Sequence, residues 1–163
     1  MARKKIELGD IFQLESDKGY IYLQCVRIPE DKRQEVELIR VYYDVQPTQT
    51  TDLSLIQKSS YFYVNFVLQA AYNRNIVEKT GNASLESDFT PPRYFRTENP
   101  FEEGWQIVDS VTMHRQSFNN LTEEQKKLSP WGSWNDTLIK ERLNGGWTLE
   151  NWEIENKPAA NNI

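Results

Sequence analysis

LTEEQKKLSPWGSWNDTLIKERLNGGWTLENW, residues 121–152, is the stretch that decides the fold, because it holds four of the five tryptophans. Its pattern predicts two short helices, Thr122–Leu128 and Asp136–Asn144, followed by a strand. Thr122 and Gln125 have the spacing of a capping box, in which each side chain accepts a backbone N–H of the other residue's turn. No residue in this stretch is arranged for chemistry. We expect it to form an aromatic lid that packs on a sheet or meets a partner.

The ends of the second helix are also marked in the sequence. Asn135 or Asp136 can cap its first turn with a side-chain oxygen. Gly145 and Gly146 favour a left-handed backbone at its last turn. The following run WTLENWEIE, residues 147–155, then alternates as a final strand. Lys157–Ile163 is expected to be a frayed tail.

The residues before position 46 predict an antiparallel meander. GDIFQL (9–14) is followed by YIYLQCVRI (20–28). This second run is apolar on both faces and therefore indicates a strand covered on both sides. EVELIRVYYDV (35–45) alternates like a half-buried strand. Each run is separated from the next by a short polar turn.

The middle of the chain is harder to assign. YFYVNFVLQAAY (61–72) is rich in aromatic and β-branched residues, which favours a strand throughout. Ile76–Lys79 is expected to continue a hairpin. Asn82–Pro100 is interpreted as a loop or edge anchored by Tyr94 and Phe95. WQIVDSV (105–111) predicts one more strand, with Trp105, Ile107 and Val111 facing inward.

Together these patterns predict a single α+β domain spanning residues 1–163. We expect a curved, partly barrel-like antiparallel sheet of about six strands, with the two short C-terminal helices packed on it. No internal repeat or domain boundary is visible in the sequence.

The composition is acidic, with a net charge of −5 and a pI near 5.0. This balance argues against direct binding of nucleic acid, which requires a clustered basic face. It could complement a basic protein, although such a charge is also ordinary for solubility. No apolar segment follows the basic start and no run is long enough to span a membrane, so we expect a cytoplasmic protein. Cys25 is expected to be a buried thiol.

The sequence offers few residues for catalysis. His114 is the only histidine, so sites with two histidine ligands are excluded. A Cys25–His114 dyad is conceivable, but a thiol in the middle of a strand is usually inert. The close carboxylate pairs lie in turns or at polar helix ends. We therefore expect no catalytic residue, metal or cofactor.

The two ends of the chain together resemble a known family. KKIELGDIFQL with YIYLQCV, and LTEEQKKLSPWGSWNDTLIKERLNGGW near the C-terminus, are similar to the immunity protein 26 family of bacterial polymorphic toxin systems. The resemblance covers about a third of the chain, and residues 50–100 do not match. It implies a protein without enzymatic activity that binds and neutralises a cognate toxin domain, often a basic nuclease or another enzyme that acts on nucleic acid.

For such a protein, rigid aromatic side chains with flanking charge are the usual contact residues. The acids next to aromatic anchors are the candidates: Asp44 beside Tyr42, and Glu150, Glu153 and Glu155 beside Trp152. Two other functions stay open, namely a carboxylate-dependent enzyme with an aromatic cleft and a module that binds single-stranded nucleic acid on its aromatic sheet face.

Overall fold

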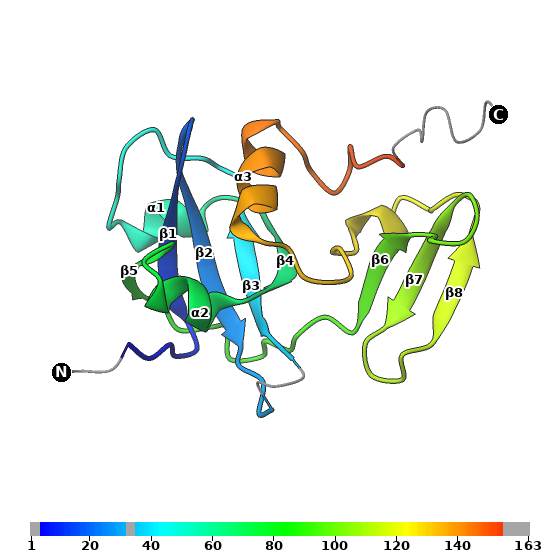
Figure 1. Ribbon diagram of the computed structural model, residues 1–163, viewed down its shortest axis with the longest axis horizontal. Helices are drawn as coiled ribbons and strands as arrows, with labels where there is room; N and C mark the ends of the chain where they lie inside the picture. Colours follow the sequence, from blue (N-terminus) through cyan, green and yellow to red (C-terminus); the bar gives the residue numbers. More distant parts are fainter. Residues whose placement is uncertain (1–3, 32–34, 155–163) are drawn as a thin grey trace.

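The computed structural model describes residues 4–31 and 35–154, which form two antiparallel sheets, three short α-helices and one 3₁₀ helix (Figure 1). The larger sheet has the strand order β4-β3-β2-β1-β5, and the smaller one has the order β6-β7-β8. The antiparallel α+β architecture is therefore confirmed. The expectation of one partly barrel-like sheet is corrected, because the strands divide into two sheets and neither closes.

The predicted meander forms the centre of the larger sheet. β1 (Asp10–Ser16), β2 (Gly19–Arg27) and β3 (Glu37–Tyr42) pair in sequence order. The β1–β2 turn requires Gly19, whose φ is +136° and whose missing Cβ would lie 2.3 Å from the Gln46 carbonyl oxygen, a conformation that only glycine adopts without strain. β2 is covered on both faces, as its apolar pattern predicted. β3 is also buried throughout, so the half-buried strand predicted there is wrong.

The run 61–72 is a strand followed by a helix. β4 (Tyr61–Phe66) pairs with β3, but α2 (Leu68–Asn73) begins two residues later. Leu68 and Ala71 are both buried, and their spacing places them on one helix face. The Glu37 side chain also accepts a hydrogen bond from the Gln69 N–H at 2.7 Å, which satisfies a backbone donor of the first turn. A residue that is far away in the sequence, on the neighbouring strand β3, therefore helps to end β4. The expectation of strand throughout 61–72 is wrong.

Two further elements of the larger sheet differ from expectation. α1 (Leu53–Gln57) precedes β4 and was not predicted, although the Asp52 side chain accepts the Leu55 N–H as an ordinary helix cap. β5 (Glu78–Asn82) pairs with β1, not with β4 as a local hairpin would. The helices thus do not all follow the strands.

The smaller sheet consists of β6 (Tyr94–Glu98), β7 (Trp105–Asp109) and β8 (Arg115–Phe118). β7 is shorter than predicted, because the Asp109 carboxylate accepts the N–H groups of Val111 and Thr112 and so turns the chain. Val111 is therefore 71% exposed, and Val108 is the apolar residue of β7 that is fully buried.

The C-terminal stretch keeps its predicted caps but not all of its predicted elements. Thr122 and Gln125 form both hydrogen bonds of the capping box, at 2.9 and 3.1 Å. The turn that they cap is only a 3₁₀ helix, η1 (Gln125–Lys127), so the α-helix expected over 122–128 is wrong. α3 (Asp136–Asn144) has the predicted bounds, and Asn135 caps it.

The last predicted strand is absent from Trp147 to Ile154, the part of that run within the described residues. Thr148 and Asn151 instead exchange side-chain to backbone hydrogen bonds at 2.8 and 3.2 Å, which fold the chain into a turn. This turn follows Gly146, whose φ is +76°, the left-handed conformation that commonly ends a helix. The tail expected over Lys157–Ile163 lies outside the described residues.

The main hydrophobic core lies between the larger sheet and the helices α2 and α3. Trp134 and Trp147 belong to it, together with Ile139 and Leu143 of α3. Cys25 is buried in the same core. None of the described helices has the length and apolar character needed to cross a membrane.

Candidate functional site

Arg96 of β6 joins two segments of the C-terminal part of the chain. It is only 1% exposed. Its Nη1 donates to the carbonyl oxygens of Lys126 and Leu149 at 2.7 and 2.9 Å, and its Nη2 donates to the carbonyl oxygen of Trp152 at 3.0 Å. The guanidinium therefore fixes η1 and the turn after α3 against the smaller sheet.

Two tryptophans enclose this guanidinium. Its central carbon lies 4.3 Å from the ring centroids of both Trp105 and Trp152, which is a favourable distance for a cation–π contact. The two indoles stand nearly perpendicular, with centroids 5.0 Å apart. Burial lowers the pKa of Arg96 to about 10, and the negative charge of Glu150 partly opposes this shift. Arg96 therefore remains a cation at neutral pH. We call Arg96, Trp105 and Trp152 the Arg96 cluster.

Each segment held by Arg96 carries exposed carboxylates. The Glu123 and Glu124 side chains, just before η1, are 89% and 85% exposed. Glu150 and Glu153, on either side of Trp152, are also exposed. Lys126 and Lys127 pair with Glu123 and Glu124 at 3.3 Å. With Glu150 and Glu153 included, the four acids of these segments outnumber the two lysines.

Asp44 follows Tyr43, whose side chain contacts the turn after α3. The Tyr43 hydroxyl accepts a hydrogen bond from the Leu149 N–H at 3.1 Å, which joins the end of β3 to the turn after α3. Burial raises the pKa of Tyr43 to about 12, and the Glu150 carboxylate adds to the increase, because a nearby negative charge disfavours the phenolate. We define the acidic surface as Glu123, Glu124, Glu150 and Glu153, the exposed acids of the two segments that Arg96 holds.

The residues predicted as partner contacts have different positions. Asp44, Glu150 and Glu153 are exposed and lie in the segments just described, and Trp152 is half-buried in the Arg96 cluster. Glu155 lies outside the described residues. Tyr42 does not lie on the surface, because it is 1% exposed and donates to the Gln24 side chain at 2.8 Å. We therefore remove Tyr42 from the contact set.

The position of Tyr42 reveals a second polar cluster, on the opposite face of the larger sheet. Arg40 is buried there, and its guanidinium donates to both Glu86 oxygens at 3.1 and 2.7 Å and to the Tyr63 hydroxyl at 3.1 Å. Burial raises the pKa of Tyr63 to about 12, although Arg40 opposes the shift. Glu86 and Tyr63 are thus both hydrogen-bonded to Arg40, which is the arrangement expected of a structural network.

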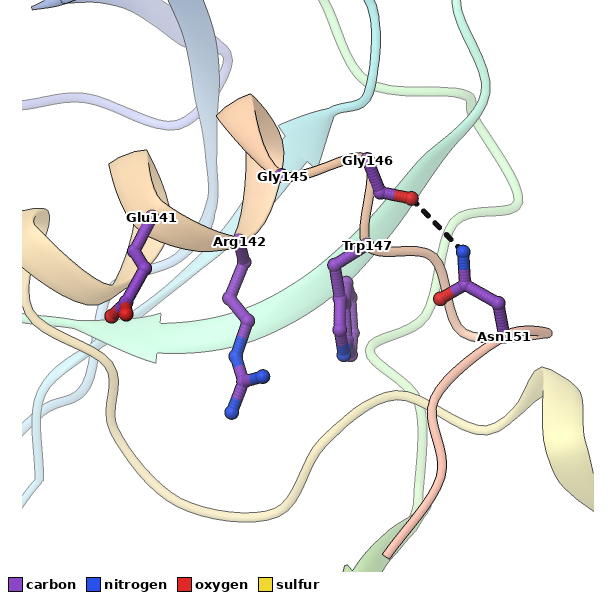
Figure 2. A pocket seen from close by; sticks show the side chains of 6 residues that line it. All are labelled: Glu141, Arg142, Gly145, Gly146, Trp147 and Asn151. Carbon is purple, nitrogen blue, oxygen red and sulfur yellow. Dashed lines mark hydrogen bonds between the residues drawn. The ribbon is translucent and has the colours of Figure 1, made fainter. Parts of the chain in front are cut away.

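A cavity of about 480 Å³ beside α3 has Glu15, Asp17 and Asp136 in its lining, but two other cavities in the described part of the chain have a single carboxylate each among their lining residues. One of about 320 Å³ lies where α3 ends, and Glu141 is the one carboxylate among its lining residues. Figure 2 shows Arg142 and Trp147 side by side in it, with the Asn151 amide donating to the Gly146 carbonyl at 2.9 Å. The other, of about 380 Å³, is lined by residues of both sheets, including Leu38, Phe95 and Trp131.

The Cys25–His114 dyad considered from the sequence has no support. Cys25 is buried in β2 of the larger sheet, whereas His114 is exposed beside β8 of the smaller one. Among the described residues there is no group of three or more histidine, cysteine, aspartate or glutamate side chains placed to hold a metal ion.

The residue that sequence reasoning missed is Arg96. A single arginine between Phe95 and Thr97 has no motif around it, and its partners are backbone carbonyls from residues 30 to 56 positions away. The alternation of β6 gives no signal either, because it places Arg96 on the same face as the exposed Tyr94.

Comparison with known proteins adds no identification. No protein family model matches the chain, and neither does any curated protein or any solved structure.

Proposed function

We propose that this protein is an immunity protein, which neutralises a basic toxin domain such as a nuclease by forming a stoichiometric complex with it. The observation that carries this proposal is the acidic surface around the Arg96 cluster. The proposal also rests on the resemblance of the two chain ends to the immunity protein 26 family.

The acidic surface has the two properties that a protein-binding site needs. Its negative charge would attract a positively charged partner and raise the rate of encounter. Its backbone is already fixed by Arg96 and by the Tyr43–Leu149 hydrogen bond, so little conformational entropy would be lost on binding. The half-buried ring of Trp152, between Glu150 and Glu153, supplies an aromatic group of the kind that dominates interface energies.

The same charges oppose a role in binding nucleic acid. Phosphates would be repelled by Glu150 and Glu153. Trp105 and Trp152 already enclose Arg96, instead of offering open ring faces to bases.

The test uses the toxin domain encoded beside this protein's gene and two double variants with the same change in net charge. Glu150→Lys with Glu153→Lys alters the acidic surface. Glu7→Lys with Glu78→Lys alters exposed acids near β5, at the far edge of the larger sheet (Figure 1). Association rates are measured by surface-based kinetics at low and physiological salt.

We expect the first double variant to slow association about tenfold at low salt, and the control to change it less than about twofold, because screening limits charge effects to roughly 8–10 Å. Protection of cells against the toxin should fall in the same order. Equal effects of the two variants would contradict the assigned surface. A failure of the unaltered protein to bind or to protect would reject the immunity function itself.

A further inference from the structure

β8 is the outer strand of the smaller sheet, and among the described residues no strand covers its other side (Figure 1). Its residues Arg115, Gln116 and Ser117 are exposed. Its four residues contain no proline, which is one of the devices that prevent an edge strand from pairing with another chain.

The pairing with β7 shows which backbone groups of β8 are available. The Asp109 N–H donates to the His114 carbonyl at 2.9 Å, and the Asp109 carbonyl accepts the Met113 N–H at 2.7 Å. Asp109 therefore forms the last hydrogen-bonded pair of the ladder, with two residues opposite it. Such pairs alternate along an antiparallel ladder, which makes Gln116 opposite Ile107 the next one. The N–H and C=O groups of Arg115 and Ser117 therefore point away from β7, toward the open edge.

Exposed apolar side chains stand at both ends of this edge. At one end, Phe101 is 88% exposed on a loop whose shape is held by the side-chain oxygen of Asn99, which accepts the N–H groups of Phe101 and Glu102. At the other end, Val111 and Met113 are 71% and 58% exposed in the β7–β8 turn. Lone exposed apolar residues are ordinary, but here they stand at both ends of one open sheet edge, where a partner strand could cover them.

The charges are also distributed between the two ends. Arg115 lies at the start of β8, beside the Val111–Met113 turn. Glu102 and Glu103 lie next to Phe101 on the loop at the other end, and Asn99 connects this loop to Ser117 by a hydrogen bond of 3.4 Å. One end of the edge is therefore basic and apolar, and the other is acidic and apolar.

We propose that this edge pairs antiparallel with the β8 of a second copy of the same chain. A twofold axis at Gln116 would bring Arg115 of each copy opposite Ser117 of the other, where the two residues exchange both backbone hydrogen bonds. The same rotation places the basic end of one copy beside the acidic end of the other. Phe101 then lies near Val111 and Met113 of the second copy, and Arg115 lies near its Glu102 and Glu103. The edge is thus complementary to itself in hydrogen bonding, charge and apolar contact.

The test is the mass of the protein in solution, measured by analytical ultracentrifugation as a function of concentration. The contact is small, so we expect a weak dimer that is half formed at roughly 100 µM. Ser117→Pro removes the outward N–H without removing a β7–β8 hydrogen bond, because proline is tolerated on an edge strand in this orientation. It should abolish the dimer, with an unchanged far-ultraviolet circular dichroism spectrum.

Ser117→Ala is the matched control, since it removes the hydroxyl group but keeps the N–H, and it should still dimerise. Arg115→Glu provides a second variant that leaves the backbone intact, and it should weaken the dimer at least about fivefold by placing like charges together. A wild-type protein that stays monomeric up to about 1 mM overturns the proposal. So does a dimer that survives both Ser117→Pro and Arg115→Glu. No toxin is needed, so this outcome is independent of the immunity function.

Discussion

Arg96 is a buried cation whose hydrogen bonds go to backbone carbonyls, whereas Arg40 on the opposite face of the larger sheet is held by the Glu86 carboxylate. Carbonyl oxygens and indole faces compensate part of the loss of hydration without adding a second buried charge, while the buried Nε has no hydrogen-bond partner among the described residues. This choice has a structural consequence. Because carbonyls belong to the backbone, Arg96 fixes the path of the chain at Lys126, Leu149 and Trp152.

This role makes a prediction about Arg96→Lys. Lysine keeps the charge but lacks the planar fork, so it cannot reach the three carbonyls together or pack a flat group against both indoles. We expect the free energy of unfolding to fall by about 2–4 kcal/mol, the range for breaking a buried polar network. The measurement is urea denaturation followed by circular dichroism.

The control for this variant is Arg74→Lys, which changes an exposed arginine in the same way. It should cost less than about 0.5 kcal/mol, as surface substitutions usually do. Equal values for the two variants would show that Arg96 is not a structural centre.

At the scale of elements, local signals predicted the structure well wherever local contacts decide it. The bounds of α3 follow from Asn135 and Gly146, and the Thr122–Gln125 capping box forms as its spacing predicted. The prediction failed where a distant residue decides. Glu37 of β3 helps to start α2 within a run that is rich in strand-forming residues, and β5 pairs with β1 across more than sixty positions.

The residues of the candidate site also divide into those whose position could be predicted from the sequence and those whose position could not. Exposed acids in polar segments, such as Glu150 and Glu153, could be predicted from the sequence because charged side chains seldom lie inside a protein. Tyr42 could not be placed, since alternation in β3 does not reveal that both faces of the sheet are covered. Arg96 could not be predicted, because its partners are backbone carbonyl groups, which every residue carries.

The cap of α3 gives a prediction at this scale. The Asn135 side chain accepts the Leu138 N–H at 2.8 Å, and Asn135→Ala leaves this donor without its partner. We expect a loss of about 1 kcal/mol in the free energy of unfolding. Thr137→Ala changes an exposed residue of the first turn that does not cap the helix. It should be neutral within about 0.5 kcal/mol. The two values come from the same denaturation experiment, and a neutral Asn135→Ala would mean that packing alone holds α3.

At the scale of the whole molecule, Trp152 connects the two sheets. Its ring lies 5.0 Å from Trp105 of the smaller sheet and 5.6 Å from Trp147 in the main core. A second contact joins Phe95 of β6 to Val26 and Leu38 of the larger sheet. The smaller sheet has three short strands, and a sheet of this size needs such packing to be stable.

The final prediction follows from this connection. If the two sheets form one cooperative unit, tryptophan fluorescence and far-ultraviolet circular dichroism should report the same urea midpoint for the wild-type protein.

Trp152→Ala removes the ring between Trp105 and Trp147, so the smaller sheet should open before the larger one. In native-state hydrogen exchange, the amides of β7 should then lose protection by about tenfold or more relative to those of β2. Phe101→Ala, which removes an aromatic ring of high exposure, is the control and should leave this ratio unchanged. Equal loss of protection in both sheets would show that Trp152 stabilises the whole fold instead of the junction, and separate midpoints in the wild-type protein would show that the two sheets are independent units.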